Sequence, residues 1–195
     1  MKIIGGKHRG RVFKSLHGQS LRPTAARTRE AVFNIIEHGI DGPPPAASSV
    51  ADVFAGAGSL GLEALSRGAA SVVFIDNNEN ALACCRENVA ALGEQHRSTL
   101  LRLDALHPPP PPLAAKTPCA YVFLDPPYNS GLAAPALGAL FAEGWIGEGS
   151  ICVVETAAKE PFEAPEGFKL IDERTYGAAK VTFLKMARNT ILDLL

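Results

Sequence analysis

Apolar and amphipathic segments alternate along the chain from residue 50 onward. The apolar segments are five or six residues long, as buried strands are, and cover Val50–Ala55, Ser71–Ile75, Thr99–Leu103, Cys119–Leu124 and Ser150–Glu155. The segments between them, Ser59–Arg67, Glu79–Leu92 and Leu132–Glu143, are predicted helices. Strands that alternate with helices predict an α/β fold, with a mostly parallel sheet covered by helices on both faces.

Two further hairpins are predicted near the ends of the chain. Phe168–Tyr176 and Lys180–Met186 flank a three-residue turn, which predicts a closing antiparallel pair. Apolar residues on either side of a glycine-rich basic turn, Gly5–Arg11, predict a second hairpin near the N-terminus.

A helix is predicted over residues 25–38. Thr24 can cap its first turn and Gly39 can end it. Residues 41–49, which include three prolines, are a predicted linker. We therefore expect a single domain over residues 1–195, with a basic N-terminal hairpin and helix over 1–40 and a Rossmann-like core over 50–186.

Charge is distributed unevenly, although the whole chain carries a net charge of −1. Residues 1–40 contain eight Lys or Arg and two acidic residues, a net charge of +6, whereas residues 41–195 carry −7. A basic arm on an acidic body is typical of a protein that meets a polyanion, such as a nucleic acid, at its N-terminus. A solvated charged face is the alternative.

The four cysteines and five histidines show no metal-ligand spacing, and Cys119 and Cys152 begin apolar strands. Gly5, Gly6 and Lys7 interrupt the apolar start of the chain, so no signal peptide is predicted. No apolar run approaches membrane-spanning length. We therefore expect a reduced, cytoplasmic, monomeric protein with no metal and no membrane partner.

The first predicted strand is followed by a glycine-rich turn. Gly56, Gly58 and Gly61 fit the pattern G-x-G-x-x-G between a strand and a helix, where small residues let a ligand approach the helix N-terminus. Asp76 ends the second strand, where an acid can accept hydrogen bonds from ribose hydroxyls. A nicotinamide dinucleotide and S-adenosylmethionine both suit these residues.

Two other acids favour S-adenosylmethionine. Asp52 lies inside the first strand, where it could hold the cationic amino-acid end of that cofactor but would repel a pyrophosphate. Asp104 follows the third strand and could accept a hydrogen bond from the adenine amino group. Structural alternatives are a hydrogen bond to a neighbouring loop for Asp52, and helix capping or a turn for Asp76 and Asp104.

The strand Cys119–Leu124 is followed by Asp125, Pro126, Pro127 and Tyr128. The prolines hold an extended corner at the carboxyl edge of the sheet, where α/β folds bind ligands. If Asp125 and the Pro126 carbonyl each accept one N–H of an exocyclic purine amine, the nitrogen lone pair can point at a methyl donor. Tyr128 would stack on the base, which must be flipped out or unpaired. The alternative is a proline-rich turn without a chemical role.

These segments resemble a known enzyme family. DVFAGAGSLG at residues 52–61, together with the D-P-P-Y tetrapeptide, looks like a class I amino-methyltransferase. IIGGKHRGR at 3–11, LRPT at 21–24 and RTREAVFNI at 27–35 narrow the resemblance to the RsmD-type family, and it extends from residue 2 to about residue 185. That family methylates the exocyclic N2 of a guanine in small-subunit ribosomal RNA.

The resemblance implies a fold, a cofactor and a substrate. The fold is a Rossmann-like, seven-stranded sheet ending in a hairpin. The cofactor is S-adenosylmethionine, which leaves as S-adenosylhomocysteine, and the segment Arg22–Thr24 folds over it. The partner is 16S rRNA or a small-subunit assembly particle.

Residues and resemblance together predict three groups of site residues. The catalytic group is Asp125, Pro126, Pro127 and Tyr128. The cofactor-binding group is Arg22, Thr24, Asp52, Phe54, Gly56, Gly58, Asp76, Asn77, Asp104, Ala105 and Asp125. The RNA-binding group is Lys7, His8, Arg9, Arg11, Lys14, Arg27 and Arg29.

One position departs from the family pattern. Asn often stands first in the family's tetrapeptide, whereas Asp, found here at position 125, is also common among DNA adenine methyltransferases. The alternatives are therefore an amino-methyltransferase acting on DNA adenine, another RNA or a protein amide, and a nucleotide-binding oxidoreductase or inactive binding module. A DNA enzyme would usually carry a separate target-recognition region, for which 195 residues leave little room.

Overall fold

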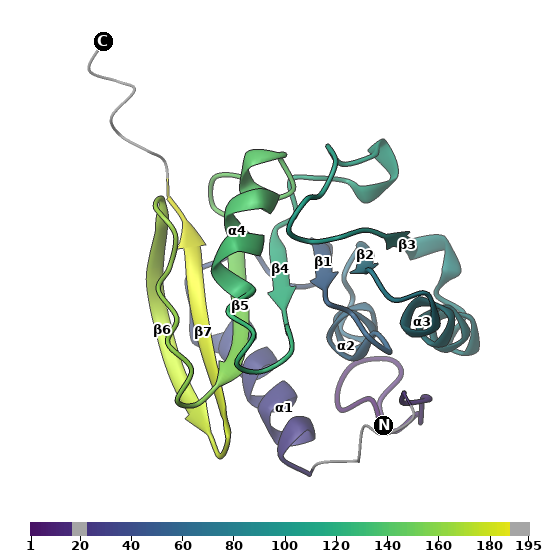
Figure 1. The fold of residues 1–195 in the computed structure, drawn as a ribbon. Helices are drawn as coiled ribbons and strands as arrows, with labels where there is room; N and C mark the ends of the chain where they lie inside the picture. Colours follow the sequence, from purple (N-terminus) through teal and green to yellow (C-terminus); the bar gives the residue numbers. More distant parts are fainter. Residues whose placement is uncertain (17–22, 188–195) are drawn as a thin grey trace.

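The computed structural model describes residues 1–16 and 23–187, and side chains are described for all of these except residues 23–25. Its strands are β1 (Ser49–Val53), β2 (Ser71–Asp76), β3 (Ser98–Arg102), β4 (Tyr121–Leu124), β5 (Ile151–Ala157), β6 (Phe168–Tyr176) and β7 (Ala179–Met186). They form one seven-stranded sheet in the order β3-β2-β1-β4-β5-β7-β6 (Figure 1). Strands β1 to β5 are parallel, and β7 lies antiparallel between β5 and β6. The predicted sheet with its closing hairpin is confirmed.

The helices cover both faces of this sheet. They are α1 (Pro23–His38), α2 (Ser59–Ser66), α3 (Glu79–Leu92) and α4 (Ala133–Ala142), with short 3₁₀ turns at Gln95–Arg97 and Leu113–Ala115. Side chains of α1, α2 and α3 pack on one face against strand residues such as Val50 and Phe123. Side chains of α4 pack on the other face against Ala51 and Val122. Successive strand residues point to opposite faces, so each central strand is buried on both sides.

The strand order reverses at β1, which has β2 on one side and β4 on the other. The connections from these strands leave in opposite directions, and a crevice opens above their carboxyl ends. This crevice lies at the ends of the strands that precede the glycine-rich turn, Asp76 and Asp125. The topology therefore brings the three predicted site segments together.

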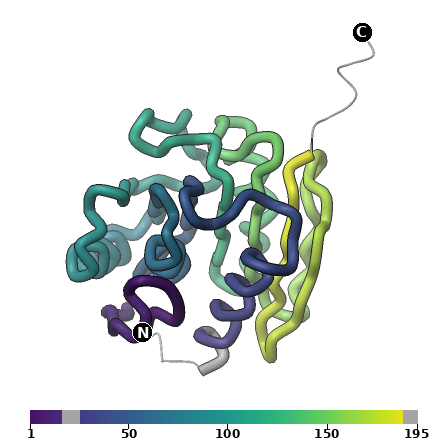
Figure 2. Tube along the Cα trace, turned by 180° about the vertical axis from the view of Figure 1, so that it is seen from behind, coloured from purple at the N-terminus to yellow at the C-terminus, as the bar shows by residue number. Residues whose placement is uncertain are grey.

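The N-terminal hairpin is docked on α2. Lys2 and Val12 form an antiparallel bridge, and the Glu63 carboxylate accepts hydrogen bonds from the backbone N–H groups of Ile4 and Gly5 at 2.9 and 2.7 Å. A Cβ added at Gly6, whose φ is +71°, would lie 1.9 Å from the carbonyl oxygen of Ser66. Figure 2 shows the hairpin and α1 on the same side of the sheet. The basic turn is therefore held in a defined position and presented beside the crevice.

Within the described ranges, no helix combines the length and apolar character needed to cross a membrane.

Candidate active site

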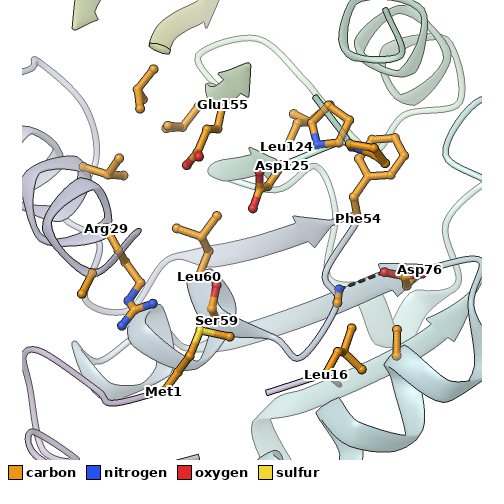
Figure 3. Close-up of a pocket in the computed structure, with 18 of the residues that line it drawn as sticks. Met1, Leu16, Arg29, Phe54, Ser59, Leu60, Asp76, Leu124, Asp125 and Glu155 are labelled. Carbon is orange, nitrogen blue, oxygen red and sulfur yellow. Dashed lines mark hydrogen bonds between the residues drawn. The ribbon is translucent and has the colours of Figure 1, made fainter. Parts of the chain in front are cut away.

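A cavity of about 1320 Å³ opens at the carboxyl ends of the central strands (Figure 3). It is larger than the roughly 300–1,000 Å³ that commonly holds one small ligand, so a cofactor and a base have room side by side. Its lining includes Phe54, Gly56, Asp76, Asn77, Asp125, Pro126, Pro127, Tyr128 and Glu155, with Arg9 from the hairpin and Arg29 from α1.

The three glycines of the turn have different neighbours. A Cβ at Gly58 would lie 2.7 Å from Cys85 Sγ, and one at Gly61 would lie 2.3 Å from the Phe74 ring, so close packing requires both glycines. A Cβ at Gly56 would meet nothing closer than 3.9 Å and would project toward the cavity that Gly56 lines. Gly56 is therefore the position at which the backbone lies open to a ligand. A contact from Gly58 to the cofactor stays a prediction.

Phe54 lies immediately before this turn and lines the same cavity. Its φ is 59°, in the left-handed region that a bulky residue rarely adopts. Such strain persists only where surrounding structure maintains it, and it is concentrated at functional sites. The outlier supports the prediction that the Phe54 backbone and ring are shaped for a ligand.

The Asp76 carboxylate faces the cavity from the end of β2. Its Oδ2 accepts a hydrogen bond from the Gly56 N–H and its Oδ1 accepts one from the Asn78 N–H, each at 2.8 Å. A carboxylate has about four acceptor sites, so both oxygens retain capacity for ribose hydroxyls. Asn77 lines the cavity beside it.

Asp52 lies beneath the turn and is only 2% exposed. Its Oδ2 accepts a hydrogen bond from the Gly61 N–H at 2.8 Å. Burial is the main cause that raises its pKa to about 7; the Gly61 hydrogen bond opposes the shift and the nearby Asp76 adds to it. Asp52 therefore has a structural contact with α2, and its predicted contact with the cofactor is not tested by this geometry.

Asp104 and Ala105 follow β3 and are not among the described residues that line the cavity. The Asp104 carboxylate is exposed, lies 2.9 Å from Nδ1 of His107 and accepts a hydrogen bond from the Leu106 N–H. The His107 hydrogen bond is the main cause that lowers the pKa of Asp104. Ala105 is buried. The predicted contacts of these two residues with adenine stay predictions.

Asp125, directly after β4, lies beside Glu155 of β5. The register of β4 and β5 pairs Leu124 with Val154, so the residues that follow them in the two parallel segments are neighbours on the same face. Figure 3 shows both carboxylates pointing into the cavity. Asp125 is exposed to the cavity, but the cavity walls enclose it, and this burial, with Glu155 and Asp52 nearby, raises the pKa of Asp125 well above its usual value. Burial also raises the pKa of Glu155, which the Tyr128 hydroxyl partly opposes.

The loop after Asp125 is held in place by the carboxylate of Glu160. Glu160 accepts hydrogen bonds from the backbone N–H groups of Asn129, Gly131 and Ala157. Burial would raise the pKa of Glu160, but these bonds outweigh it and lower the pKa. The loop is thereby tied to the end of β5, which positions Pro126 and Tyr128 against the cavity.

Sequence reasoning missed Glu155 and Glu160. Glu155 ends an apolar strand, which is the signal that singled out Asp76 and Asp125, and the same signal applied to the fifth strand would have found it. No local pattern identifies Glu160, because its hydrogen-bond partners in the Asp125 loop lie about thirty residues earlier in the chain.

The predicted RNA-binding cations differ in their surroundings. The exposed Lys7 and the half-buried His8 both contact the Glu94 carboxylate, and Lys14 pairs with Glu87. Burial would raise the pKa of Glu94, but hydrogen bonds from its basic neighbours lower it to about 2.

Three arginines complete this group. Arg11 donates to the backbone carbonyl of Ala91. Arg9 and Arg27 are exposed, and no carboxylate among the described residues pairs with either. These two are therefore the cations of the group most available to a phosphate.

Arg29 is buried, contrary to the exposed position expected of an RNA contact. Its side chain is 5% exposed, donates to the carbonyl of Lys2 and lies 3.5 Å from Glu63. A positive charge near the start of a helix opposes the helix dipole, and the ion pair with Glu63 compensates the charge of Arg29 there. Arg29 holds the hairpin to α2.

The segment Arg22–Thr24, predicted to fold over the cofactor, lies partly outside the residues that the structure describes. Arg22 and the side chain of Thr24 are outside the described residues. Their predicted contacts with the cofactor stay predictions.

Comparison with known proteins shows the family. The model of the family described as Conserved hypothetical protein 95 matches residues 1–185. Ribosomal RNA small subunit methyltransferase D of Haemophilus influenzae is 33% identical, with 91% of this chain and 89% of that protein covered. The chain belongs to the RsmD family.

Two further proteins similar to this chain are described as methyltransferases. YlbH of Bacillus subtilis, described as a candidate rRNA methyltransferase, is 37% identical over 66% of this chain and 67% of its own. The solved structure of yhhF, a methyltransferase candidate from Escherichia coli, superposes with a TM-score of 0.80 at 29% identity, covering 96% of this chain and 98% of that one. The RsmD-family chain has a class I methyltransferase fold, and S-adenosylmethionine is the cofactor that this fold implies. The oxidoreductase alternative is therefore wrong.

The cavity fits that cofactor chemically. Gly56 leaves room for a close approach, and Asp76 retains acceptor sites for hydroxyl groups. Asp76, Asp125 and Glu155 all line the cavity, and their acidity suits a cationic sulfonium compound better than a pyrophosphate.

Proposed function

We propose that this protein transfers a methyl group from S-adenosylmethionine to the exocyclic N2 amine of a guanine in small-subunit ribosomal RNA. The observation that carries the proposal is the Asp125 carboxylate, which faces the same cavity as the glycine-rich turn and Asp76. Among the described residues, it has no hydrogen-bond partner and no paired cation. A carboxylate that faces an enclosed cavity without a protein partner is available to a hydrogen-bond donor, so its partner is expected to be a ligand.

The chemistry assigned to Asp125 follows from the amine that it would meet. An exocyclic purine amine is a poor nucleophile, because its lone pair is delocalised into the ring. Hydrogen bonds from its two N–H groups to Asp125 and the Pro126 carbonyl would let the nitrogen pyramidalise and aim its lone pair. The bound cofactor supplies an electrophilic methyl group on a sulfonium.

Asp125 also has a role after the new bond forms. The N2–carbon bond forms as the carbon–sulfur bond breaks, and the sulfur retains that electron pair. The methylated nitrogen then carries a positive charge and one proton too many. Asp125 would stabilise this charge and accept the proton, for which its raised pKa makes the carboxylate a better base.

The hairpin provides the surface for RNA. Arg9 lines the cavity and is exposed, and Arg27 is exposed near the start of α1. Phosphate contacts from such cations give affinity and register, and they carry no base specificity. A guanine reaching the cavity would be flipped out of a helix or taken from an unpaired segment.

The direct test is methyl transfer to small-subunit particles and 16S rRNA taken from cells that lack this protein, followed by mass-spectrometric mapping of nucleosides. We expect N2-methylguanosine at one site, and no product with Asp125→Ala. Thermal unfolding of that variant serves as the control for folding. N6-methyladenosine as the product, or no RNA product, would contradict the proposed function.

A further inference from the structure

Two acidic side chains, Asp125 and Glu155, line the part of the cavity where the guanine is proposed to bind. The mechanism proposed above uses only Asp125. Asp125 directly follows β4 and Glu155 lies in β5, each next to a member of the Leu124–Val154 pair, and both side chains point into the cavity. Neighbouring strands lie roughly 4.8 Å apart, so the two carboxylates are within reach of one flat ligand.

Glu155 is oriented by a specific contact. The Tyr128 hydroxyl donates a 2.6 Å hydrogen bond to Glu155 Oε1. No described residue donates a hydrogen bond to Glu155 Oε2, so this oxygen can accept one from another group. Because Tyr128 belongs to the same tetrapeptide as Asp125, the two carboxylates are held in a fixed relation to each other.

The pair has no counter-charge from the described part of the protein. Neither carboxylate has a basic partner there, and their mutual repulsion contributes to the raised pKa of Asp125. Like charges placed together in an enclosed site are unfavourable unless something compensates them. A ligand that presents several N–H donors along one edge would do so.

Guanine presents such an edge. Its N1–H and one N2–H lie nearly parallel along the Watson–Crick edge, and the second N2–H points away from them, toward the N3 side. Three acceptors are available here: the Pro126 carbonyl, Asp125 and Glu155. Adenine offers two N–H groups but a bare N1, whose lone pair would face a carboxylate.

We propose that Glu155 is a specificity-determining residue that accepts the N1–H hydrogen bond of the target guanine. Asp125 and Pro126 hold the N2 amine, and Glu155 distinguishes guanine from purines that lack a proton at N1. This inference rests on the proposed function and adds to it the residue that selects the base. It would explain how an enzyme with Asp in place of the more common Asn can still act on guanine.

The test uses a small-subunit RNA carrying guanine, 2-aminopurine or adenine at the mapped position. 2-Aminopurine keeps the reactive N2 amine but has no N1–H. We expect wild-type kcat/KM for guanine to exceed that for 2-aminopurine by at least about a hundredfold, since a site built to bind a donor rejects an analogue that lacks it.

Glu155→Gln is the decisive variant. Its amide N–H can donate to a bare N1, so the preference for guanine should fall to within about tenfold, through slower guanine transfer and equal or faster 2-aminopurine transfer. Tyr128→Phe keeps the ring but removes the orienting hydroxyl, so its loss of discrimination should be smaller. Both variants should bind S-adenosylhomocysteine as the wild type does.

The outcomes distinguish base selection by Glu155 from the proposed function itself. If Glu155→Gln slows both substrates by the same factor, or if wild type methylates both equally, Glu155 does not select the base, while the proposed function stands. If wild type methylates adenine at this position, or transfers to none of the three RNAs, the proposed function and this inference both fail.

Discussion

The carboxylate of Asp76 accepts a 2.8 Å hydrogen bond from the backbone N–H of Gly56, 20 positions earlier in the chain. The bond joins the end of β2 to the glycine-rich turn after β1. The two predicted halves of the cofactor site are therefore one connected unit, in which the acid shapes the turn as well as facing the ligand.

Asp76→Ala should weaken S-adenosylhomocysteine binding by about 1–3 kcal/mol, because the variant loses an acceptor for the ligand and the bond that holds Gly56. Asp76→Asn keeps one acceptor oxygen and should lose less. Isothermal calorimetry on both variants measures the difference, with thermal unfolding as the control. Unchanged affinity in a folded Asp76→Ala protein would remove Asp76 from the cofactor site.

Asp125→Ala should lose about a hundred- to a thousandfold in the rate of methyl transfer, since one preorganised acceptor is removed from the reacting amine. Asp125→Asn should be milder, because its side-chain oxygen still accepts an N–H. Single-turnover kinetics on undermethylated particles distinguish the roles. An Asn variant as slow as Ala would show that the negative charge is essential, and full activity in Ala would show that the residue is only part of a turn.

The double change Arg9→Ala and Arg27→Ala should weaken binding to small-subunit RNA and reduce the salt dependence of that binding by about two phosphate contacts. Lys14→Ala is a matched control, because Lys14 is an exposed cation of the same arm that is already paired with Glu87. Filter binding at several salt concentrations gives both slopes. If Lys14→Ala changed the RNA affinity and its salt dependence as much as the double variant does, ion pairing within the arm would not determine which cations contact RNA.

Asp52 should make folding stability depend on pH. Its pKa rises from an ordinary 3.8 to about 7 on folding, so between these values the folded state holds a proton that the unfolded state has lost. The contribution of Asp52 to stability is therefore fully present below pH 4 and is lost as pH rises through 7, by up to about 4 kcal/mol in total.

Asp52→Asn should remove this contribution, because the amide does not titrate while its oxygen can still accept from Gly61. Urea unfolding of both proteins between pH 5 and 8 measures it. Asp125 and Glu155 contribute slopes of the same sign in both proteins, but Asp52 helps to raise the pKa of Asp125. The difference between the curves therefore reports Asp52 together with its effect on Asp125. Parallel curves for the two proteins would show that Asp52 keeps an ordinary pKa in the folded state.

Short-range patterns in the chain were sufficient to predict the elements. Each predicted helix lies within two residues of its observed ends, because helix period, caps and glycine stops are encoded within a few residues of one another. The alternation of strands and helices then predicted the parallel sheet, and strand-end acids such as Asp76 and Asp125 were expected at its carboxyl edge, where α/β folds place their ligands.

The sequence by itself therefore determined the order of elements, the sheet type and the edge at which the site lies. Tertiary structure alone decided which side chains meet there. Asp125 acquires Glu155 as a neighbour through strand register, Glu160 anchors the loop beside them from a distant segment, and Arg29 is buried by docking of the hairpin on α2. Such pairings depend on how separate elements pack, and local propensity carries no information about a partner thirty residues away.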